Sequence, residues 1–315
     1  IFMKKLVLVL FIVFFHIVGF SQSTKPTNYL SKEFHKSRRD VIRSKMPENS
    51  IAVIFANPIR NRANDVDYIF HQDPNFYYLT GYREPNAILL LFSENQTDEF
   101  GVDYNEILYV QKRDQRAEMW NGKRLGVEGA ISELGFSKAM NADDFINSTI
   151  NFKKFESFFI EKFNDDYRNL TGVVIFDLVK TFKVKSGYDP SLFLSRMKEY
   201  IYSNIAETPV ESSANVIRII DRLASRSSEI KNDDLLNTYK SATTADLKKE
   251  IKQKIIIALQ PKTNINIDFL SSTLATMREV KTSEELRLLT KAIRISAVGQ
   301  VEVMKAMKPH MSEIE

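Results

Sequence analysis

The 315-residue sequence contains no cysteine, which excludes disulfide bonds, thiolate metal sites and cysteine nucleophiles. Histidine is scarce, with four in the chain. Glycine is also scarce: the chain has only 10, far fewer than the usual proportion of about 7% would give in 315 residues. No glycine-rich phosphate loop and no Gly-x-Ser-x-Gly nucleophile motif occurs. These absences exclude the common nucleotide-binding loops and serine-hydrolase elbows, and they leave little visible catalytic equipment.

The N-terminal segment carries the longest apolar run of the sequence. Two residues precede Met3, two lysines follow it, and residues 6–20 are almost wholly apolar before the polar stretch that starts at Ser21. This pattern predicts a cleaved signal peptide over residues 1–21, and therefore export to the periplasm or the extracellular space. A retained membrane anchor is the alternative, although the run is shorter than the ~20 residues that a spanning helix needs.

The remaining chain has the composition of a folded protein with little net charge. Loss of residues 1–21 removes two lysines and lowers the net charge from +4 to +2. Interspersed charges of both signs argue against an electrostatic nucleic-acid binder. Hydrophobic residues make up 43% of the chain and include 22 phenylalanines, which excludes intrinsic disorder.

Hydrophobic patterning predicts an α/β domain with a mixed sheet. Residues 30–46 are expected to form a surface helix that ends before Pro47 and exposes His35. Residues 138–170 are expected to be helical, and the charged, periodic stretch 186–260 is expected to form a helical layer or insertion. The predicted strands are 51–56, 76–80, 87–92, 107–110, 173–178 and, at a sheet edge, 265–267.

Trp120 and Asp65 are the residues that the local sequence singles out. Trp120 is the only tryptophan and lies in a polar stretch, 114–135, which indicates an exposed loop that presents an aromatic side chain. Partial burial as a structural lid is the alternative. Asp65 lies in a polar loop between two predicted strands, where binding sites are often built, although a solvated aspartate is the commoner outcome.

The remaining histidines do not form a metal site in the sequence pattern. His71 and His310 have no second histidine within helical or strand reach, and a metal ion needs several converging ligands. We therefore expect His71 to be a hydrogen-bonding loop residue.

The C-terminal residues contain two helix-start signals. Thr282 and Glu285 form a capping-box pattern before a helix with apolar residues at i, i+3 and i+4 steps. Residues 312–315 form a second capping box immediately before the last residue. With the start before Met3, this pattern predicts a truncated reading frame, and a naturally frayed tail is the alternative.

Three ordered segments resemble the aminopeptidase P family of Xaa-Pro aminopeptidases. Residues 73–91, DPNFYYLTGYREPNAILLL, resemble the signature of the family's N-terminal domain, and residues 113–126, RDQRAEMWNGKRLG, resemble its second signature. Residues 277–286, MREVKTSEEL, are similar to the entry into the catalytic "pita-bread" domain. The resemblance covers about residues 30–145 and 263–315, with a helical insertion between them.

The resemblance implies a metallopeptidase that releases the N-terminal residue from peptides with proline second. The X-Pro bond is a tertiary amide without an N–H, so proteases that bind an extended backbone handle it poorly. Family members use two divalent metals, usually manganese, held by two aspartates, one histidine and two glutamates. No position of this sequence matches those ligands, which implies that they lie beyond Glu315 and that this chain alone is inactive.

The resemblance also implies a domain organisation. Residues 1–21 would be the signal peptide, 22–275 the N-terminal domain with the insertion at about 186–260, and 276–315 the incomplete start of the catalytic domain.

The resemblance further implies partners and site residues. Trp120 matches a tryptophan that reaches toward a neighbouring subunit's active site in family tetramers, and Asp65 matches an aspartate near that site. The implied partners are proline-containing peptides and further copies of the chain, as a dimer or tetramer, with no nucleic acid. Two alternatives stay open: a non-catalytic binding or oligomerisation module, and a prolidase- or creatinase-type relative.

Overall fold

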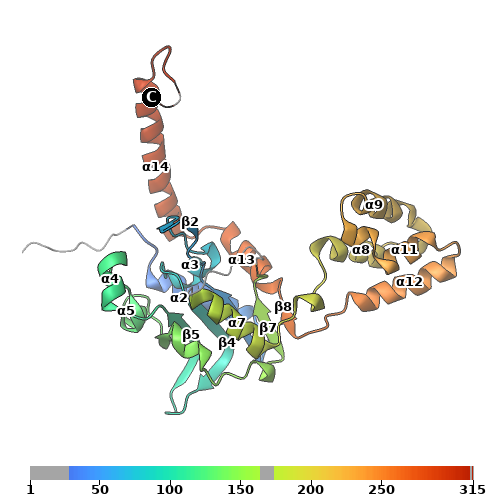
Figure 1. Cartoon of the computed structure of the whole chain (residues 1–315), viewed down its shortest axis with the longest axis horizontal. Helices are drawn as coiled ribbons and strands as arrows, with labels where there is room; N and C mark the ends of the chain where they lie inside the picture. Colours follow the sequence, from blue (N-terminus) through green and yellow to red (C-terminus); the bar gives the residue numbers. More distant parts are fainter. Residues whose placement is uncertain (1–27, 164–173, 313, 315) are drawn as a thin grey trace, which may run out of the picture.

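The computed structural model describes residues 28–163, 174–312 and 314. The predicted signal peptide and part of the second capping box lie outside the described residues. A six-stranded mixed sheet has the order β6-β5-β4-β1-β7-β8 (Figure 1). Its strands are β1 Ser50–Phe55, β4 Ile88–Thr97, β5 Asp103–Val110, β6 Ala139–Asn141, β7 Ser157–Ile160 and β8 Ile265–Asn266. The pairs β1/β4 and β4/β5 are antiparallel and the other three are parallel, which confirms the predicted α/β mixed-sheet class.

Helices cover both faces of this sheet. One face carries Ala52 and Ile54 of β1 and packs against α2 Lys32–Lys45, α3 Pro74–Thr80 and α13 Phe269–Glu279. The other face carries Ile51 and Val53 and packs against α6 Ala142–Ile146 and α7 Val174–Ser186. Side chains alternate along a strand, so a strand covered on both faces is apolar on both, as β1 is from Ile51 to Phe55.

Two predicted strands are helices in the structure. Residues 76–80 belong to α3, because the Asp73 side chain caps the backbone N–H groups of Asn75 and Phe76, and Gly81 ends the helix in the left-handed conformation. Residues 174–178 begin α7, whose buried positions Ile175, Leu178 and Phe182 recur at helical spacing. Val173, the first residue of that predicted strand, lies outside the described residues.

Two further local predictions are wrong. Residues 138–170 were expected to be helical, but the described part contains β6, α6, a 3-10 turn Phe152–Lys154 and β7. The apolar residues of β7 pair with β1 inside the sheet rather than forming a helix. The neighbourhood of Trp120 was expected to form an exposed loop, but it contains α4 Gln115–Asn121, and α5 Gly126–Ser132 follows in the same polar stretch. Asp114 caps α4 through its side chain, a start signal compatible with the polar sequence.

The helical prediction for residues 186–260 is confirmed. The segment forms a separate helical unit beside the sheet (Figure 1), and we refer to its helices α8 to α12 as the helical unit. Its helices are α8 Arg196–Glu207, α9 Ala214–Ala224, α10 Ser228–Lys231, α11 Asp234–Ser241 and α12 Ala245–Ala258. It has its own buried core, with Ile201 and Tyr202 from α8, Ile220 from α9 and Ile255 from α12.

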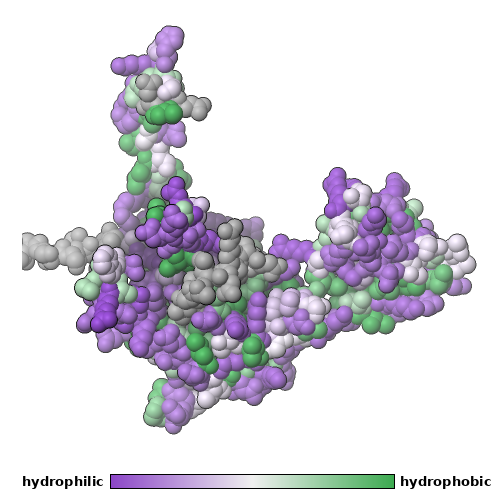
Figure 2. Space-filling view, in the orientation of Figure 1, coloured by the Kyte–Doolittle hydropathy of each residue, from purple (hydrophilic) through white to green (hydrophobic). Residues whose placement is uncertain are grey.

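The last helix, α14 Ser283–Ala306, projects from the domain (Figure 1). The predicted capping box is present, with the Thr282 side chain and the Glu285 carboxylate each accepting a backbone N–H. None of its residues, all of which the structure describes, is buried. Figure 2 shows hydrophobic side chains along its surface, and no helix in the described part of the chain has the length and apolarity to cross a membrane.

Candidate functional site

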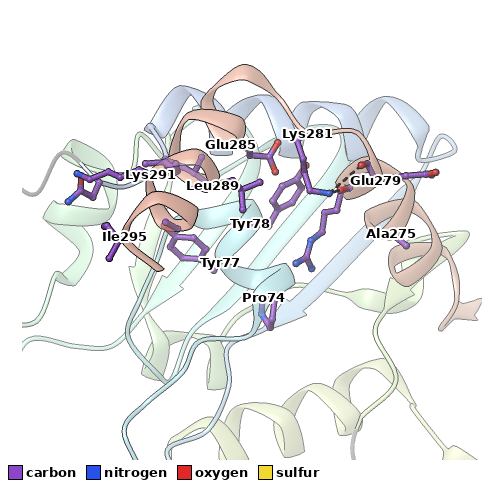
Figure 3. Close-up of a pocket in the computed structure, with 15 residues that line it drawn as sticks. Pro74, Tyr77, Tyr78, Ala275, Glu279, Lys281, Glu285, Leu289, Lys291 and Ile295 are labelled. Atoms are coloured by element: carbon purple, nitrogen blue, oxygen red, sulfur yellow. Dashed lines mark hydrogen bonds between the residues drawn. The ribbon is translucent and has the colours of Figure 1, made fainter. Parts of the chain in front are cut away.

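A groove of about 840 Å³ lies where α14 leaves the domain, and we refer to it as the α14 groove. Figure 3 shows Tyr77 and Tyr78 of α3 next to Leu289 and Ile295 of α14. Arg278 of α13 completes the wall and lies over the Tyr78 ring, with its Cζ 5.8 Å from the ring centroid. The volume suits a small molecule or an inserted side-chain cluster, and the lining is mainly apolar and aromatic.

Two polar residues of the α14 groove, Tyr78 and Arg278, form hydrogen bonds with residues beside it. The Tyr78 hydroxyl donates to the Met277 carbonyl at 3.2 Å, and Arg278 donates to the Asn75 side-chain oxygen at 2.9 Å. Asn75 in turn donates to Glu161 at 2.6 Å. Burial raises the pKa of the Glu161 carboxyl and the pKa of the Tyr78 hydroxyl. The groove therefore offers mainly apolar and aromatic contact surface, with Tyr78 and Arg278 held in place by hydrogen bonds.

A carboxylate fixes the start of α14 against the domain. Glu284 accepts hydrogen bonds from the backbone N–H of Ser31 at 2.5 Å and from its hydroxyl at 3.0 Å. Ser31 is also the residue that caps α2. The two helices thus begin at one polar junction, although they are about 250 positions apart in the chain.

His35 is buried, whereas the sequence predicted a surface position. Only 2% of the residue is exposed, and its Nδ1 donates to the Tyr78 carbonyl at 2.9 Å. Burial lowers the pKa of the His35 imidazole. The prediction failed because α2 turns this residue toward α3, which the sequence pattern had presented as a strand.

Metal ligands do not converge in the described residues. No group of three histidine, aspartate or glutamate side chains within the described ranges could hold a metal ion. His71 is a hydrogen-bonding loop residue, as predicted, although it bonds through its backbone: its carbonyl accepts from the Asn57 side chain at 3.1 Å. His310 is exposed in a turn after α14.

Trp120 is exposed, as the polar sequence around it predicted, but it lies on helix α4 rather than in a loop. The residue is 88% exposed and its neighbour Met119 is 77% exposed. Arg113 and Glu118 form a bidentate ion pair that closes the first turn of α4. A tryptophan held by a well-formed helix with its ring in solvent is suited to a contact with another molecule.

Asp65 lies at the tip of a short hairpin. The strands are β2 Asn61–Ala63 and β3 Val66–Asp67, and Asn64 adopts a left-handed turn conformation with φ of 50°. Asp65 is exposed. With so little of its ring covered, Trp120 does not pack on Asp65 in the described part of the chain. Their roles at an inter-subunit site stay predictions.

The aromatic and basic residues of the α14 groove were not predicted from the sequence. The Tyr78 hydroxyl donates to the Met277 carbonyl, and the two residues are 199 positions apart in the chain. No local spacing reveals such a pair, because only the packing of α13 against β7 and α14 against α2 brings the segments together.

The fold defines the class of protein: a mixed α/β domain that carries a helical unit and a projecting last helix. Residues 35–155 match the sequence model of the aminopeptidase P N-terminal domain family. Over these residues the chain is therefore similar to the N-terminal domain of the aminopeptidase P family.

Characterised relatives agree with this family. Over 116 residues the chain is 39% identical to an Xaa-Pro aminopeptidase of Haemophilus influenzae, which covers 37% of this chain and 26% of the relative. It is 35% identical over 111 residues to the Xaa-Pro aminopeptidase of Escherichia coli, which covers 35% of this chain and 24% of the relative. The chain thus spans about a quarter of the length of these relatives.

Solved structures were also matched. The structure of aminopeptidase P from E. coli with the inhibitor Pro-Leu aligns with a TM-score of 0.40 and 21% identity. The alignment covers 62% of this chain and 51% of that chain.

Proposed function

We propose that the chain is the N-terminal part of an exported, metal-dependent Xaa-Pro aminopeptidase. The observation that carries the proposal is the family match over residues 35–155, together with relatives that are themselves Xaa-Pro aminopeptidases. The substrates would be peptides with proline in the second position. Export rests on the basic and apolar pattern of residues 1–21.

In this proposal the chain provides contact surfaces, and the catalytic domain holds the metal ions and carries out peptide hydrolysis. The described residues offer no group that fits a metal pair, so none of them is assigned a step in peptide hydrolysis. Two divalent ions, manganese in the family pattern, would be held by ligands beyond Glu315, and this chain alone would cleave nothing. A metal pair would there activate water for attack on the X-Pro carbonyl.

The exposed apolar face of α14 indicates that another polypeptide segment packs against this helix. Leu286 is 52% exposed, Leu289 44% and Ile293 65%, so one apolar stripe runs along the helix. Such a stripe on a projecting helix marks an interaction surface. We assign it to packing with the rest of the catalytic domain.

Peptidase activity tests the proposal directly. The protein from the complete gene, loaded with Mn²⁺, is expected to release the first residue of an Xaa-Pro-Xaa tripeptide but not to split an Xaa-Pro dipeptide. The 315-residue chain under the same conditions is the matched control and is expected to release nothing. Cleavage of the dipeptide alone would support a prolidase-type relative, and a stop codon directly after Glu315 would contradict the proposal.

An oligomerisation role is the second candidate, favoured by the exposure of Met119 and Trp120. Trp120→Ala in the full-length enzyme is expected to reduce turnover and to leave the melting temperature of the monomer unchanged, because the ring is not packed in the core. Trp120→Phe is the control that keeps an aromatic ring. A large fall in melting temperature with unchanged specific activity would oppose a contact role.

A further inference from the structure

The segment that carries Asp65 leaves the domain and returns through a narrow neck. The side-chain oxygen of Gln72 accepts from the backbone N–H of Asn57 at 2.9 Å and from that of Asp73 at 2.9 Å. The Asn57 side chain also donates to the His71 carbonyl at 3.1 Å. Because Asn57 follows β1 and Asp73 precedes α3, one amide oxygen joins the two ends of the hairpin segment.

The segment that carries Trp120 is held at both ends by a second pair of side chains. Gln111, directly after β5, donates its backbone N–H to the Tyr82 hydroxyl at 3.1 Å. Leu125, which follows α4, donates its backbone N–H to the Glu84 carboxylate at 2.7 Å. Tyr82 donates to the other oxygen of Glu84 at 3.0 Å, so the two ends share one anchor.

One hydrogen bond connects the two anchors. The side-chain nitrogen of Gln72 donates to the backbone carbonyl of Glu84 at 2.8 Å. Both polar atoms of the Gln72 amide and both oxygens of the Glu84 carboxylate are therefore used. Tyr82 is 1% exposed, and its burial, together with the nearby Glu84 charge, raises the pKa of its hydroxyl. The Tyr82 hydroxyl therefore keeps the proton that it donates to Glu84. A fully satisfied network of this kind is rigid.

We propose that Gln72 and Glu84 are positioning residues that hold the Asp65 hairpin and the Trp120 helix in one fixed arrangement. Its relevance to a peptide or subunit contact rests on the proposed function, but the arrangement itself is a property of this chain. The exposed side chains of Asp65 and Trp120 do not touch each other. The distance between them is therefore set by the Gln72 and Glu84 hydrogen bonds that join the ends of their two segments.

Composition gives a direct way to measure that distance. Trp120 is the only tryptophan and the chain has no cysteine, so Asp65→Cys creates a single labelling site for a fluorescent acceptor. Time-resolved energy transfer from Trp120 to the label reports the distribution of distances between the two segments. In the otherwise unchanged chain we expect a narrow distribution.

Three substitutions at two positions test the Gln72–Glu84 link separately from the hydrogen bonds that close the hairpin segment. Gln72→Glu keeps an oxygen for the N–H groups of Asn57 and Asp73 but loses the donor to the Glu84 carbonyl, and it is expected to broaden the distribution. Glu84→Ala removes the acceptor for Leu125 and is expected to broaden it as well. Glu84→Gln keeps one acceptor oxygen and is expected to restore a narrower distribution than Glu84→Ala.

The control is Glu128→Ala on α5, an exposed glutamate whose carboxylate makes no hydrogen bond to the described residues. It is expected to leave the distribution unchanged. An unchanged distribution in Gln72→Glu, with circular dichroism showing a folded chain, would overturn the proposal, and this variant decides the matter if Glu84→Ala does not fold. The measurement uses no metal and no peptide, so its failure would leave the proposed peptidase function standing.

Discussion

Arg39 shows how a single side chain can join three elements of the domain. Its guanidinium makes two hydrogen bonds to the Glu106 carboxylate of β5, at 2.8 and 2.9 Å, and one to the Leu79 carbonyl of α3 at 2.8 Å. It also lies over the Phe136 ring, 4.0 Å from the centroid. Arg39 is 0% exposed and Glu106 4%, so the buried Arg39 charge depends on Glu106, whose carboxylate also accepts a hydrogen bond from Arg43 at 3.0 Å.

Removal of this buried partner is expected to be costly. Arg39→Ala should lower the free energy of unfolding by about 3 kcal/mol, the low end for a broken buried ion pair, because it removes the fully buried partner of Glu106 and, among the described residues, leaves Arg43 as the only cation bonded to that carboxylate. Urea denaturation followed by circular dichroism measures the change. Lys36→Ala on the same helix is the control: Lys36 and Asp40 form an exposed ion pair, which contributes at most about 1 kcal/mol. Equal effects of the two substitutions would contradict the assignment.

His35 gives the fold a predictable response to acid. Burial lowers its pKa below 6.5, and the nearby Arg39 charge adds to this, while the Tyr78 carbonyl and Glu284 oppose it. The unfolded chain therefore binds the proton more readily, so the stability contributed by neutral His35 is complete above about pH 6.5 and falls as the pH drops toward the lowered pKa.

Comparison of urea midpoints at about pH 7.5 and about pH 5.5 tests this response. The unsubstituted chain should lose more stability between the two values than His35→Gln, which has no titrating group at this position. Glu161, whose raised pKa acts in the opposite sense, is present in both chains and cancels in the comparison. An equal pH dependence in the two chains would show that His35 does not carry the effect.

At the scale of elements, the end of α3 shows why one glycine is required. Gly81 has φ of 70°, and an added Cβ would lie 2.7 Å from His35 Cδ2. Gly101 has φ of 76° but no described atom within 4 Å of an added Cβ. The two positions therefore share the same backbone strain and differ only in space.

Alanine at these two glycines is expected to separate strain from overpacking. Gly101→Ala should cost about 1–2 kcal/mol, the penalty of the left-handed conformation. Gly81→Ala should cost about 1–3 kcal/mol more, because its methyl group would displace a buried imidazole. Denaturant unfolding of both variants measures the difference. A cost at Gly81 no greater than at Gly101 would mean that the imidazole moves freely.

The same helix shows how far the sequence could predict the fold. The long apolar runs of β1 and β4 were predictable because they are continuous and bounded by turn residues. Short apolar runs such as 76–80 fit a strand or a buried helix equally well, and only the capping residues Asp73 and Gly81 distinguish the two. The error at 174–178 has the same cause, since the helical spacing extends past the six residues that suggested a strand.

The candidate site was predictable only where it depends on local sequence. The polar neighbours of Trp120 indicated its exposure, which the structure bears out. The anchors Gln72 and Glu84 could not be inferred, because Glu84 and Leu125 lie 41 positions apart and are joined through a turn and a strand end. Long-range hydrogen bonds of this kind leave no periodic signal in the sequence.

At the scale of the whole molecule, the sheet and the helical unit are built around separate cores. The helical unit buries residues from α8 to α12, and none of them belongs to the two cores of the sheet. Its two connections run past one cavity of about 320 Å³, lined by residues 191–194 on one side and 258–264 on the other. Because the chain leaves and returns at one place, the sheet does not depend on the unit for its closure.

Deletion of the helical unit is therefore expected to leave the sheet domain folded. Replacement of residues 195–258 by a short Gly-Ser linker should remove helical circular dichroism and keep the near-ultraviolet signal of the sheet core. The melting temperature should change by no more than about 4 °C, the shift that about 1 kcal/mol produces in a domain of this size. Loss of the near-ultraviolet signal would show that the sheet needs the unit.

Ile220→Asp in the intact chain supplies the complementary measurement. Ile220 is 1% exposed in the core of the helical unit, so an unpaired carboxylate there should unfold the unit and leave the sheet in place. Calorimetry should then show a sheet transition at the temperature found for the deletion variant. A single transition shifted downward for the whole molecule would mean that the two cores unfold together, and that the helical unit is a structural part of the domain rather than an addition to its edge.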